Sequence, residues 1–166
     1  MDCLFCNTHY DNQVRFSDIF FLTPLKQSIC KECKAGFEAI DERHCPRCFK
    51  AHHQGVCSDC KAWEKEGYLV NHKTLYRYNS QMKAYFSRFK FQGDYLLASL
   101  FQEEIKQALK AYKGYTIVAI PLGKKRYEER QFNQVLALLE GSGYRHQELL
   151  GKHDSQKQSS KGKKSV

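Results

Sequence analysis

Short runs of apolar and aromatic residues after residue 67 each predict one element of secondary structure. Residues 68–78 contain leucine, valine and tyrosine in a β-favouring setting, and Asn79 and Ser80 then give a turn and helix N-cap signal. Apolar side chains recur at helical spacing over residues 80–91, with lysine and arginine between them. This stretch therefore predicts an amphipathic helix, which Gly93 ends.

A second helix and a buried strand are predicted next. Asp94 can cap a helix whose apolar stripe faces a core, and Gly114 stops that helix. Residues 115–120 form an unbroken apolar, β-branched run, which is typical of a strand buried on both faces. A loop over 121–131 and a third helix over 132–140 follow. The order β, α, α, β, loop, α predicts an α/β domain built on a parallel sheet.

The first 67 residues give a weaker hydrophobic pattern. Residues 16–22 could form a short helix or a short strand, and periodicity cannot decide between them over so few positions. Residues 35–40 predict a short helical turn. The strongest feature of this part is chemical, because all eight cysteines of the chain occur there in four Cys-x-x-Cys pairs. The pairs are Cys3/Cys6, Cys30/Cys33, Cys45/Cys48 and Cys57/Cys60.

Four such pairs are a ligand set for two tetrahedral, structural zinc ions. A Cys-x-x-Cys pair places two sulfurs on one tight turn, where they can hold a metal at about 2.3 Å, and two turns complete a four-sulfur shell. The first two pairs are separated by 23 residues and the last two by 8. Sequential pairing is sterically easy, and a cross-braced pairing stays open from the spacing alone.

Other uses of these cysteines are less consistent with the sequence. Disulfides need an oxidising compartment, and the start of the chain has neither the basic nor the apolar region of a secretion signal, so we expect a cytoplasmic protein. A redox dithiol would leave three pairs unexplained. His44, His52 and His53 could replace a cysteine as ligands, but a full thiolate set makes them loop residues. A closed four-thiolate site has no open position for substrate, which makes the metal architectural.

Positive charge is concentrated outside the cysteine pairs. The net charge of +9 divides into −1 for residues 1–67, +6 for residues 68–150 and +4 for residues 151–166. Two zinc ions, each bound by four thiolates, would bring the net charge of the first segment to about −5. A segment with this charge would bind a phosphate backbone poorly. The last segment has almost no apolar side chains and predicts a mobile basic tail. No apolar run approaches the length of a membrane span.

Four blocks of residues in this order resemble the ComF family of competence-associated, phosphoribosyltransferase-like proteins. The first block is the set of paired cysteines, and the second begins with Tyr76-Arg77-Tyr78-Asn79 and ends with Gly93-Asp94. The third is Ile120-Pro121-Leu122 at the end of the predicted strand. The fourth, residues 126–134, is similar to the family's Arg-Gly-Phe-Asn-Gln signature, with Gln131 at the position of its glycine.

The resemblance implies a double zinc ribbon over residues 1–67, a partial type I phosphoribosyltransferase-like domain over 68–150 and a tail over 151–166. It implies a role in taking up single-stranded DNA during natural transformation, alongside a competence helicase, in the cytoplasm and at the inner face of the membrane through partners. Ligand loops lie at the carboxyl ends of strands in such a fold, and the cations there suit a phosphate. The expected anion contacts are Lys124, Lys125, Arg126 and Arg130, with Asn133 and Gln134 positioning or capping the loop.

A phosphoribosyl pyrophosphate (PRPP) site in this fold class needs an acidic pair followed by a Thr/Gly-rich loop that holds the 5′-phosphate. The chain contains no such motif, and Ser155-Gln156-Lys157-Gln158 resembles the segment that precedes it in the family. We therefore expect a chain truncated before the PRPP motif, with no catalytic residues. PRPP and Mg²⁺ would bind only to a full-length relative. Two alternatives stay open: an active phosphoribosyltransferase, and a structural zinc module joined to an incompletely folded remnant.

Residues 73–95 interleave basic and aromatic side chains, and this pattern has two interpretations. Aromatic platforms beside cations hold single-stranded nucleic acid without sequence preference. The same aromatics at helical spacing also predict the buried face of a helix with a solvated basic rim, and this interpretation accounts for more of the residues. Exposure of Tyr78, Phe91 or Tyr95 would favour nucleic-acid binding.

Overall fold

A computed structural model describes residues 1–11 and 29–153 of the chain. The chain divides into two compact units, Met1–Phe86 and Ser87–Val166. The expectations for residues 16–22 and for most of the basic tail fall outside the described residues. The domain boundaries predicted from the sequence stay a prediction.

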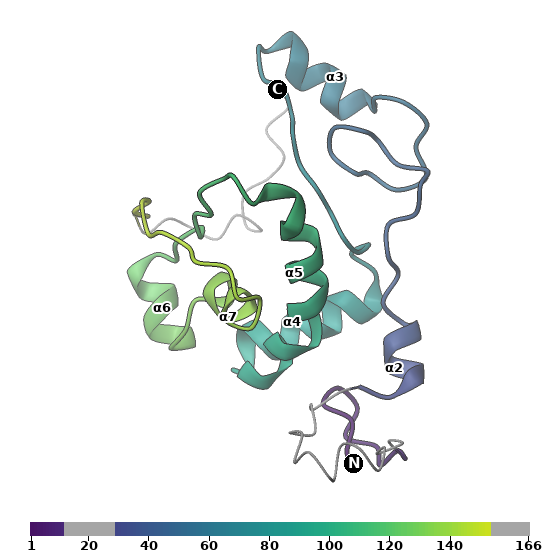
Figure 1. Ribbon diagram of the computed structural model, residues 1–166, viewed down its shortest axis with the longest axis vertical. Coiled ribbons are helices and arrows are strands. Elements are labelled where there is room, and N and C mark those ends of the chain that lie inside the picture. Colours follow the sequence, from purple (N-terminus) through teal and green to yellow (C-terminus); the bar gives the residue numbers. More distant parts are fainter. Residues whose placement is uncertain (12–28, 154–166) are drawn as a thin grey trace. The chain divides into compact units, whose positions relative to one another are not determined.

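Within residues 1–11 and 29–86, the first unit contains two short helices and the start of a longer one (Figure 1). Helix α2 spans Lys31–Ala35, α3 spans Ser58–Lys65 and α4 spans Ser80–Phe91, so α4 continues into the second unit. Among the described residues of this unit, the extended segments pair at isolated bridges, which join Asp2 to His9, Ala39 to Tyr76 and His44 to Ala51.

The segment predicted as a strand over residues 68–78 is extended and lies against the cysteine-bearing part of the first unit, but it does not form a continuous β-strand. The Ile40 N–H donates to the Leu75 carbonyl at 3.0 Å, and the Arg77 N–H donates to the Glu38 carbonyl at 2.8 Å. One antiparallel bridge results instead of a ladder. The side chains of Arg77 and Glu38 add an ion pair across the same two segments.

The helix start predicted at Asn79 and Ser80 is confirmed. The Asn79 side-chain oxygen accepts from the Met82 N–H at 3.0 Å, as an N-cap residue does, and its amide donates to the Gly36 carbonyl at 2.9 Å. Phe37 packs edge-to-face on Tyr76 and Tyr85, with ring centroids 6.4 and 6.1 Å away. These contacts tie the first turns of α4 to the segment that follows α2.

The second unit is built on short helices that pack around aromatic side chains (Figure 1). They are the 3-10 helix η1 at Tyr95–Phe101, α5 at Gln102–Leu109, the 3-10 helix η2 at Lys110–Tyr112, α6 at Lys124–Arg130 and α7 at Gln134–Glu140. Helix α7 lies against both η1 and α5. Phe132, just before α7, meets the rings of Phe89 and Tyr95 at 5.3 and 5.2 Å.

Several predictions for this unit were wrong. The single helix expected after Asp94 is divided into η1, α5 and η2, and the Asp94 carboxylate pairs with Arg88 instead of capping the first turn. The region expected as a loop over 121–131 contains α6. An ion pair that returns to the preceding helix competes with capping for the same carboxylate, and sequence spacing cannot rank the two.

The strand expected over residues 115–120 is present only as an extended segment, and the expectation of burial on both faces was wrong. Val118 forms one parallel bridge with Gln147, whose N–H donates to the Ile117 carbonyl at 2.8 Å. Tyr115 is 73% exposed and Ile120 is 66% exposed. Burial on both faces needs pairing and packing partners on either side, and the described residues supply a single neighbouring segment.

Within residues 1–11 and 29–153, none of the helices combines the length and the apolar character that crossing a bilayer requires.

Substitution of Phe89 should test the core of the second unit. Phe89 is fully buried, whereas Phe91, two residues along the same helix, is 72% exposed. Phe89→Ala should lower the free energy of unfolding by about 3–5 kcal/mol because it removes a buried ring and leaves a cavity. Phe91→Ala is the matched control and should change it by roughly 0.5 kcal/mol or less. Thermal unfolding followed by circular dichroism measures both, and equal losses would contradict this packing.

Gln131 offers a second test, because it has the left-handed conformation that usually belongs to glycine. Its φ is 63° at the end of α6, and its N–H donates to the Tyr127 carbonyl at 2.7 Å. Gln131→Gly and Gln131→Ala both lose the side-chain bond to the Glu128 carbonyl. The glycine variant should be more stable than the alanine variant by about 0.5–1 kcal/mol, since glycine adopts this conformation without a Cβ clash. A chain in which the glycine variant is the least stable of the three would contradict this account.

Candidate functional site

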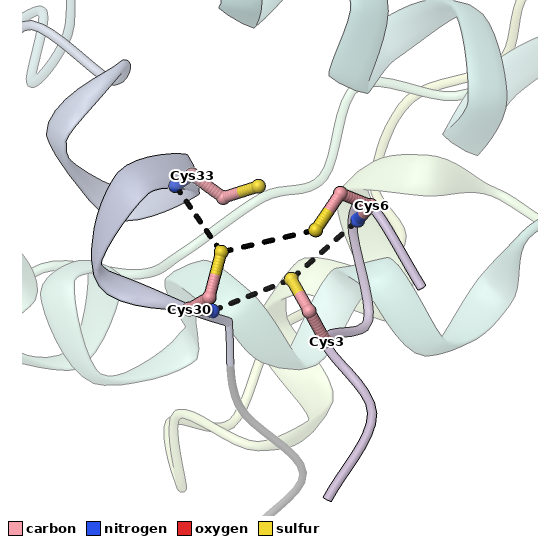
Figure 2. A group of neighbouring side chains, drawn as sticks. All are labelled: Cys3, Cys6, Cys30 and Cys33. Atoms are coloured by element: carbon pink, nitrogen blue, oxygen red, sulfur yellow. Dashed lines mark hydrogen bonds between the residues drawn. The ribbon is translucent and has the colours of Figure 1, made fainter. Parts of the chain in front are cut away.

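The sulfur atoms of Cys3, Cys6, Cys30 and Cys33 converge in the first unit, and all lie within 4.8 Å of one another. Figure 2 shows the four side chains pointing toward a common centre, two from the N-terminal turn and two from the start of α2. Cys3, Cys30 and Cys33 are buried and Cys6 is exposed. The Cys6 and Cys30 sulfurs are 3.8 Å apart.

Backbone geometry brings these side chains together. In the N-terminal turn, the Asn7 N–H donates to the Cys3 carbonyl at 2.9 Å, and Asn7 takes the left-handed conformation with a φ of 58°. At the start of α2, Cys30 is the N-cap residue, and its sulfur accepts from the Cys33 N–H at 3.4 Å. The Cys30 N–H donates in turn to the Cys3 sulfur at 3.3 Å, which joins the two halves directly.

A second cluster, made by Cys45, Cys48, Cys57 and Cys60, has the same design. Its sulfurs also lie within 4.8 Å of one another, with Cys45 to Cys60 at 3.8 Å and Cys48 to Cys57 at 3.6 Å. Phe49, like Asn7 in the first cluster, takes the left-handed conformation with a φ of 58°. Cys57, like Cys30, is the N-cap residue of its helix, α3. The pairing of the cysteine turns is therefore sequential, a choice that spacing had left open.

Histidine takes no part in either group. The groups that the described residues form contain cysteine alone. His44 stacks on the Phe49 ring with centroids 4.1 Å apart, and a His44 ring nitrogen lies 3.1 Å from the Cys45 carbonyl. These contacts support the interpretation of His44 as a loop residue beside a cysteine turn.

The cations expected to bind phosphate lie on α6 rather than on a loop. Lys124 and Lys125 are exposed, whereas Arg126 and Arg130 are partly buried and stand four residues apart, on one face of the helix. The Arg130 guanidinium donates to the Gln134 side chain at 2.9 Å and lies 5.5 Å from the centre of the Phe91 ring.

Asn133 caps helix α7, whereas its predicted role at a phosphate-binding loop stays a prediction. Its side-chain oxygen accepts from the Val135 N–H at 2.9 Å, which caps α7, and its amide donates to the Ile120 carbonyl at 3.2 Å. Asn133 thus fixes α7 to the end of the extended segment. Gln134 instead holds the Arg130 guanidinium, so the two residues divide the positioning of this region between them.

Lys90 was absent from the predicted anion contacts, although the structure places it near them. Burial and the neighbouring charge of Arg130 lower the pKa of Lys90, and burial and the charge of Arg126 lower the pKa of Arg130. Cations whose charged form is disfavoured by burial and by a neighbouring cation, as at Lys90 and Arg130, are typical of an anion site. Lys90 is on α4, and only tertiary packing could show that it lies close to α6.

The chain is similar over nearly its whole length to curated proteins with one name. It is 40% identical over 163 residues to the competence protein ComFC of Streptococcus pneumoniae, which covers 98% of this chain and 74% of that protein. The chain belongs to the ComFC family. The ComFC of Bacillus subtilis is 32% identical over 169 residues, covering 97% of this chain and 70% of that protein.

Neither the family models nor the solved structures searched give a match. Membership of the ComFC family confirms the resemblance found in the sequence, and the two clusters fit the double zinc ribbon that this resemblance implied.

Each cluster of this ComFC family member could hold one metal ion. A tetrahedron of sulfurs at about 2.3 Å from a metal has edges of about 3.8 Å, close to the 3.6–3.8 Å separations of the second cluster. Burial opposes ionisation of Cys45, but the backbone N–H groups of Cys57, Cys48 and Arg47 lower the pKa of this thiol to about 5. Backbone donors therefore prepare a thiolate, the form that binds metal.

The two clusters predict two separate metal ions. Cobalt titration of the full chain should reach two ions, with the strong visible bands of tetrahedral thiolate coordination. Cys57→Ser should bind one ion, since it removes a ligand from the second cluster only, and the neighbouring Ser58→Ala should still bind two. Loss of both ions in Cys57→Ser would contradict separate sites.

Proposed function

We propose that this protein serves in natural transformation, as an accessory protein for the uptake of single-stranded DNA. The observation that carries the proposal is the 40% identity, over 98% of the chain, to a protein named for competence. The proposed place of action is the cytoplasm and the inner face of the membrane, beside the helicase of the uptake machinery.

Zinc is the proposed metal in both clusters. Four thiolates in a closed tetrahedron suit zinc, which has no redox chemistry of its own and holds turns together. Each ion would join a Cys-x-x-Cys turn to the start of a helix. The turn of Cys3 and Cys6 would be joined to α2, and the turn of Cys45 and Cys48 to α3. The role of the zinc is therefore architectural, and binding of partners falls to other surfaces.

The proposed nucleic-acid contacts are the cations of α6 together with Lys90. Phe91 supports this assignment because its ring is 72% exposed and lies beside Arg130. Tyr78 and Tyr95 are also exposed, at 69% and 39%. A cation can bind a phosphate of the strand, and an exposed ring beside it can stack on a base. Proteins hold single strands without sequence preference in this way. Tyr85 and Phe89 are buried, so the core interpretation holds for them.

The second unit is proposed to be part of a phosphoribosyltransferase-like domain built on a parallel sheet. The bridge between Val118 and Gln147 is parallel, and the connection between these residues contains α6 and α7. Parallel segments joined through helices are the building unit of that fold class. The given residues contain no acidic-pair and Thr/Gly motif of a PRPP site. A full-length relative with that motif is the proposed binder of PRPP and Mg²⁺.

Substitution of the α6 arginines should test the nucleic-acid site. Arg126→Ala/Arg130→Ala should weaken binding of a fluorescent oligo-dT by about tenfold or more and reduce the salt slope of log K by roughly 1.4, as expected for two lost phosphate contacts. Fluorescence anisotropy at several salt concentrations measures both quantities.

Lys110→Ala/Lys113→Ala is the matched control, because it removes the same charge from the same unit around η2. It should leave the binding constant within about twofold, apart from the general effect of net charge. Equal effects of the two double variants would overturn the α6 site. Transformation frequency in a competent host tests the wider role, and an unchanged frequency without the protein would overturn it.

A further inference from the structure

The two cysteine clusters are an internal repeat, and the differences between the copies show what each copy is built to do. Superposing the pairs places Cys3 on Cys45, Cys6 on Cys48, Cys30 on Cys57 and Cys33 on Cys60. The backbone agrees at each step, because the Cys3 N–H donates to the Thr8 carbonyl and the Cys45 N–H to the Lys50 carbonyl, both at 3.0 Å. Differences between the copies therefore lie in the side chains.

Charged side chains join the two halves of the second cluster. Arg47, inside the turn, donates to Glu64 of α3 at 2.9 Å, and Lys50 donates to Asp59 of α3 at 2.9 Å. The equivalent positions in the first cluster are Phe5 and Phe37, whose rings meet at 5.7 Å, and Thr8 and Glu32. One copy thus joins its halves with ion pairs and the other with an aromatic contact.

These joining contacts have similar strength, so they do not by themselves rank the two sites. Exposed ion pairs contribute about 0.2–1 kcal/mol each, and an aromatic pair about 0.5–1.5 kcal/mol. What differs is the placement of charge, because each ion pair of the second cluster contains one cation and one carboxylate. A divalent metal with four thiolates has a formal charge of −2. The cationic partners interact electrostatically with the cysteines: Arg47 with Cys45 and Cys60, and Lys50 with Cys48 and Cys57.

Arg47 is positioned for this role. Its Nη2 atom is held by Glu64, while its Nη1 atom is buried and has no hydrogen-bond partner within the described part of the chain. A buried donor without an acceptor costs free energy, and the negative charge of a metal-loaded thiolate cluster offsets that cost. In the first cluster the same position is the uncharged Phe5.

The exposure of Cys6 and the number of residues between the two cysteine pairs also favour release of metal from the first cluster. Cys6 is exposed, whereas its counterpart Cys48 is only partly exposed. Each cluster must also close a loop between its two halves, and 23 intervening residues against 8 make closure of the first about fivefold less favourable. Water, chelators and oxidants can therefore reach the first cluster more easily, and its open form is more populated.

We propose that the two metal centres are unequal: the second is a permanent centre retained by Arg47 and Lys50, and the first is an exchangeable centre that releases its metal first. The proposal rests on zinc binding by both clusters. Arg47 and Lys50 are positioning residues that act through the cluster without supplying a ligand. Retention of metal by the second centre should depend on salt, since ion pairs support it, and retention by the first should not.

Chelator-induced release from the full, zinc-loaded chain tests the proposal. Excess EDTA with a chromogenic zinc indicator should show two phases of equal amplitude, with rates at least about fivefold apart. Cys60→Ser retains the first cluster only and should release its zinc at the fast rate, whereas Cys33→Ser should release at the slow rate. Higher salt should accelerate the slow phase alone.

Arg47→Met/Lys50→Thr should accelerate the slow phase by about fivefold or more without changing the fast phase, as expected for loss of charge beside the cluster. Lys65→Thr, on the same helix, is the matched control and should leave both phases unchanged. Alkylation of the wild-type chain should label the cysteines of the first cluster before those of the second, a measurement that needs no cysteine variant.

The failures are distinguishable. A wild-type chain that binds fewer than two zinc ions would overturn the assignment of zinc to both clusters. Two ions released in one phase, the reverse assignment of phases, or simultaneous labelling of all cysteines would overturn the inequality while leaving the zinc sites intact.

Discussion

The convergence of four sulfur atoms on one point is the constraint on which the first unit depends. Around each cluster the buried residues are largely the cysteines themselves, with a few partly buried side chains such as Phe5 and Val70 packed against them. So small an apolar core around each cluster leaves the cysteine turns dependent on further links. If the clusters hold metal as proposed, metal binding would be coupled to the folding of these turns and would fix the starts of α2 and α3.

The second unit depends on a different physical principle. Phe89, Leu97 and Phe101 are buried, and Phe132 packs between aromatic rings from α4 and η1. This packing sets the distance between α4 and α6 and so gathers the positive charges of Lys90, Arg126 and Arg130. The cysteine clusters and this cationic group are separated along the chain, because all eight cysteines lie in the first unit and the three cations lie in the second.

The repeat of the cysteine clusters shows how one backbone plan accepts different side chains. Left-handed residues after each turn and cysteine N-caps on each helix conserve the geometry of the four sulfurs. The contacts around that geometry are aromatic in one copy and ionic in the other. Under the proposed metal binding, retention would be adjustable in each centre without a change of ligands, because charge and exposure act on the cluster from outside its first coordination shell.

The sequence by itself determined the ligand set, the helix over Ser80–Phe91 and the family, because cysteine spacing, helical periodicity and capping are local properties. Gln131 occupies the glycine position of the family signature. Its left-handed φ explains why the signature has glycine there, since glycine adopts this conformation most easily. Tertiary structure alone decided the sequential pairing of the cysteine turns, the ion pair that takes Asp94 away from its helix, and the approach of Lys90 to α6. Each of these depends on which distant segments meet, and a local pattern contains no information on the free energy of those contacts.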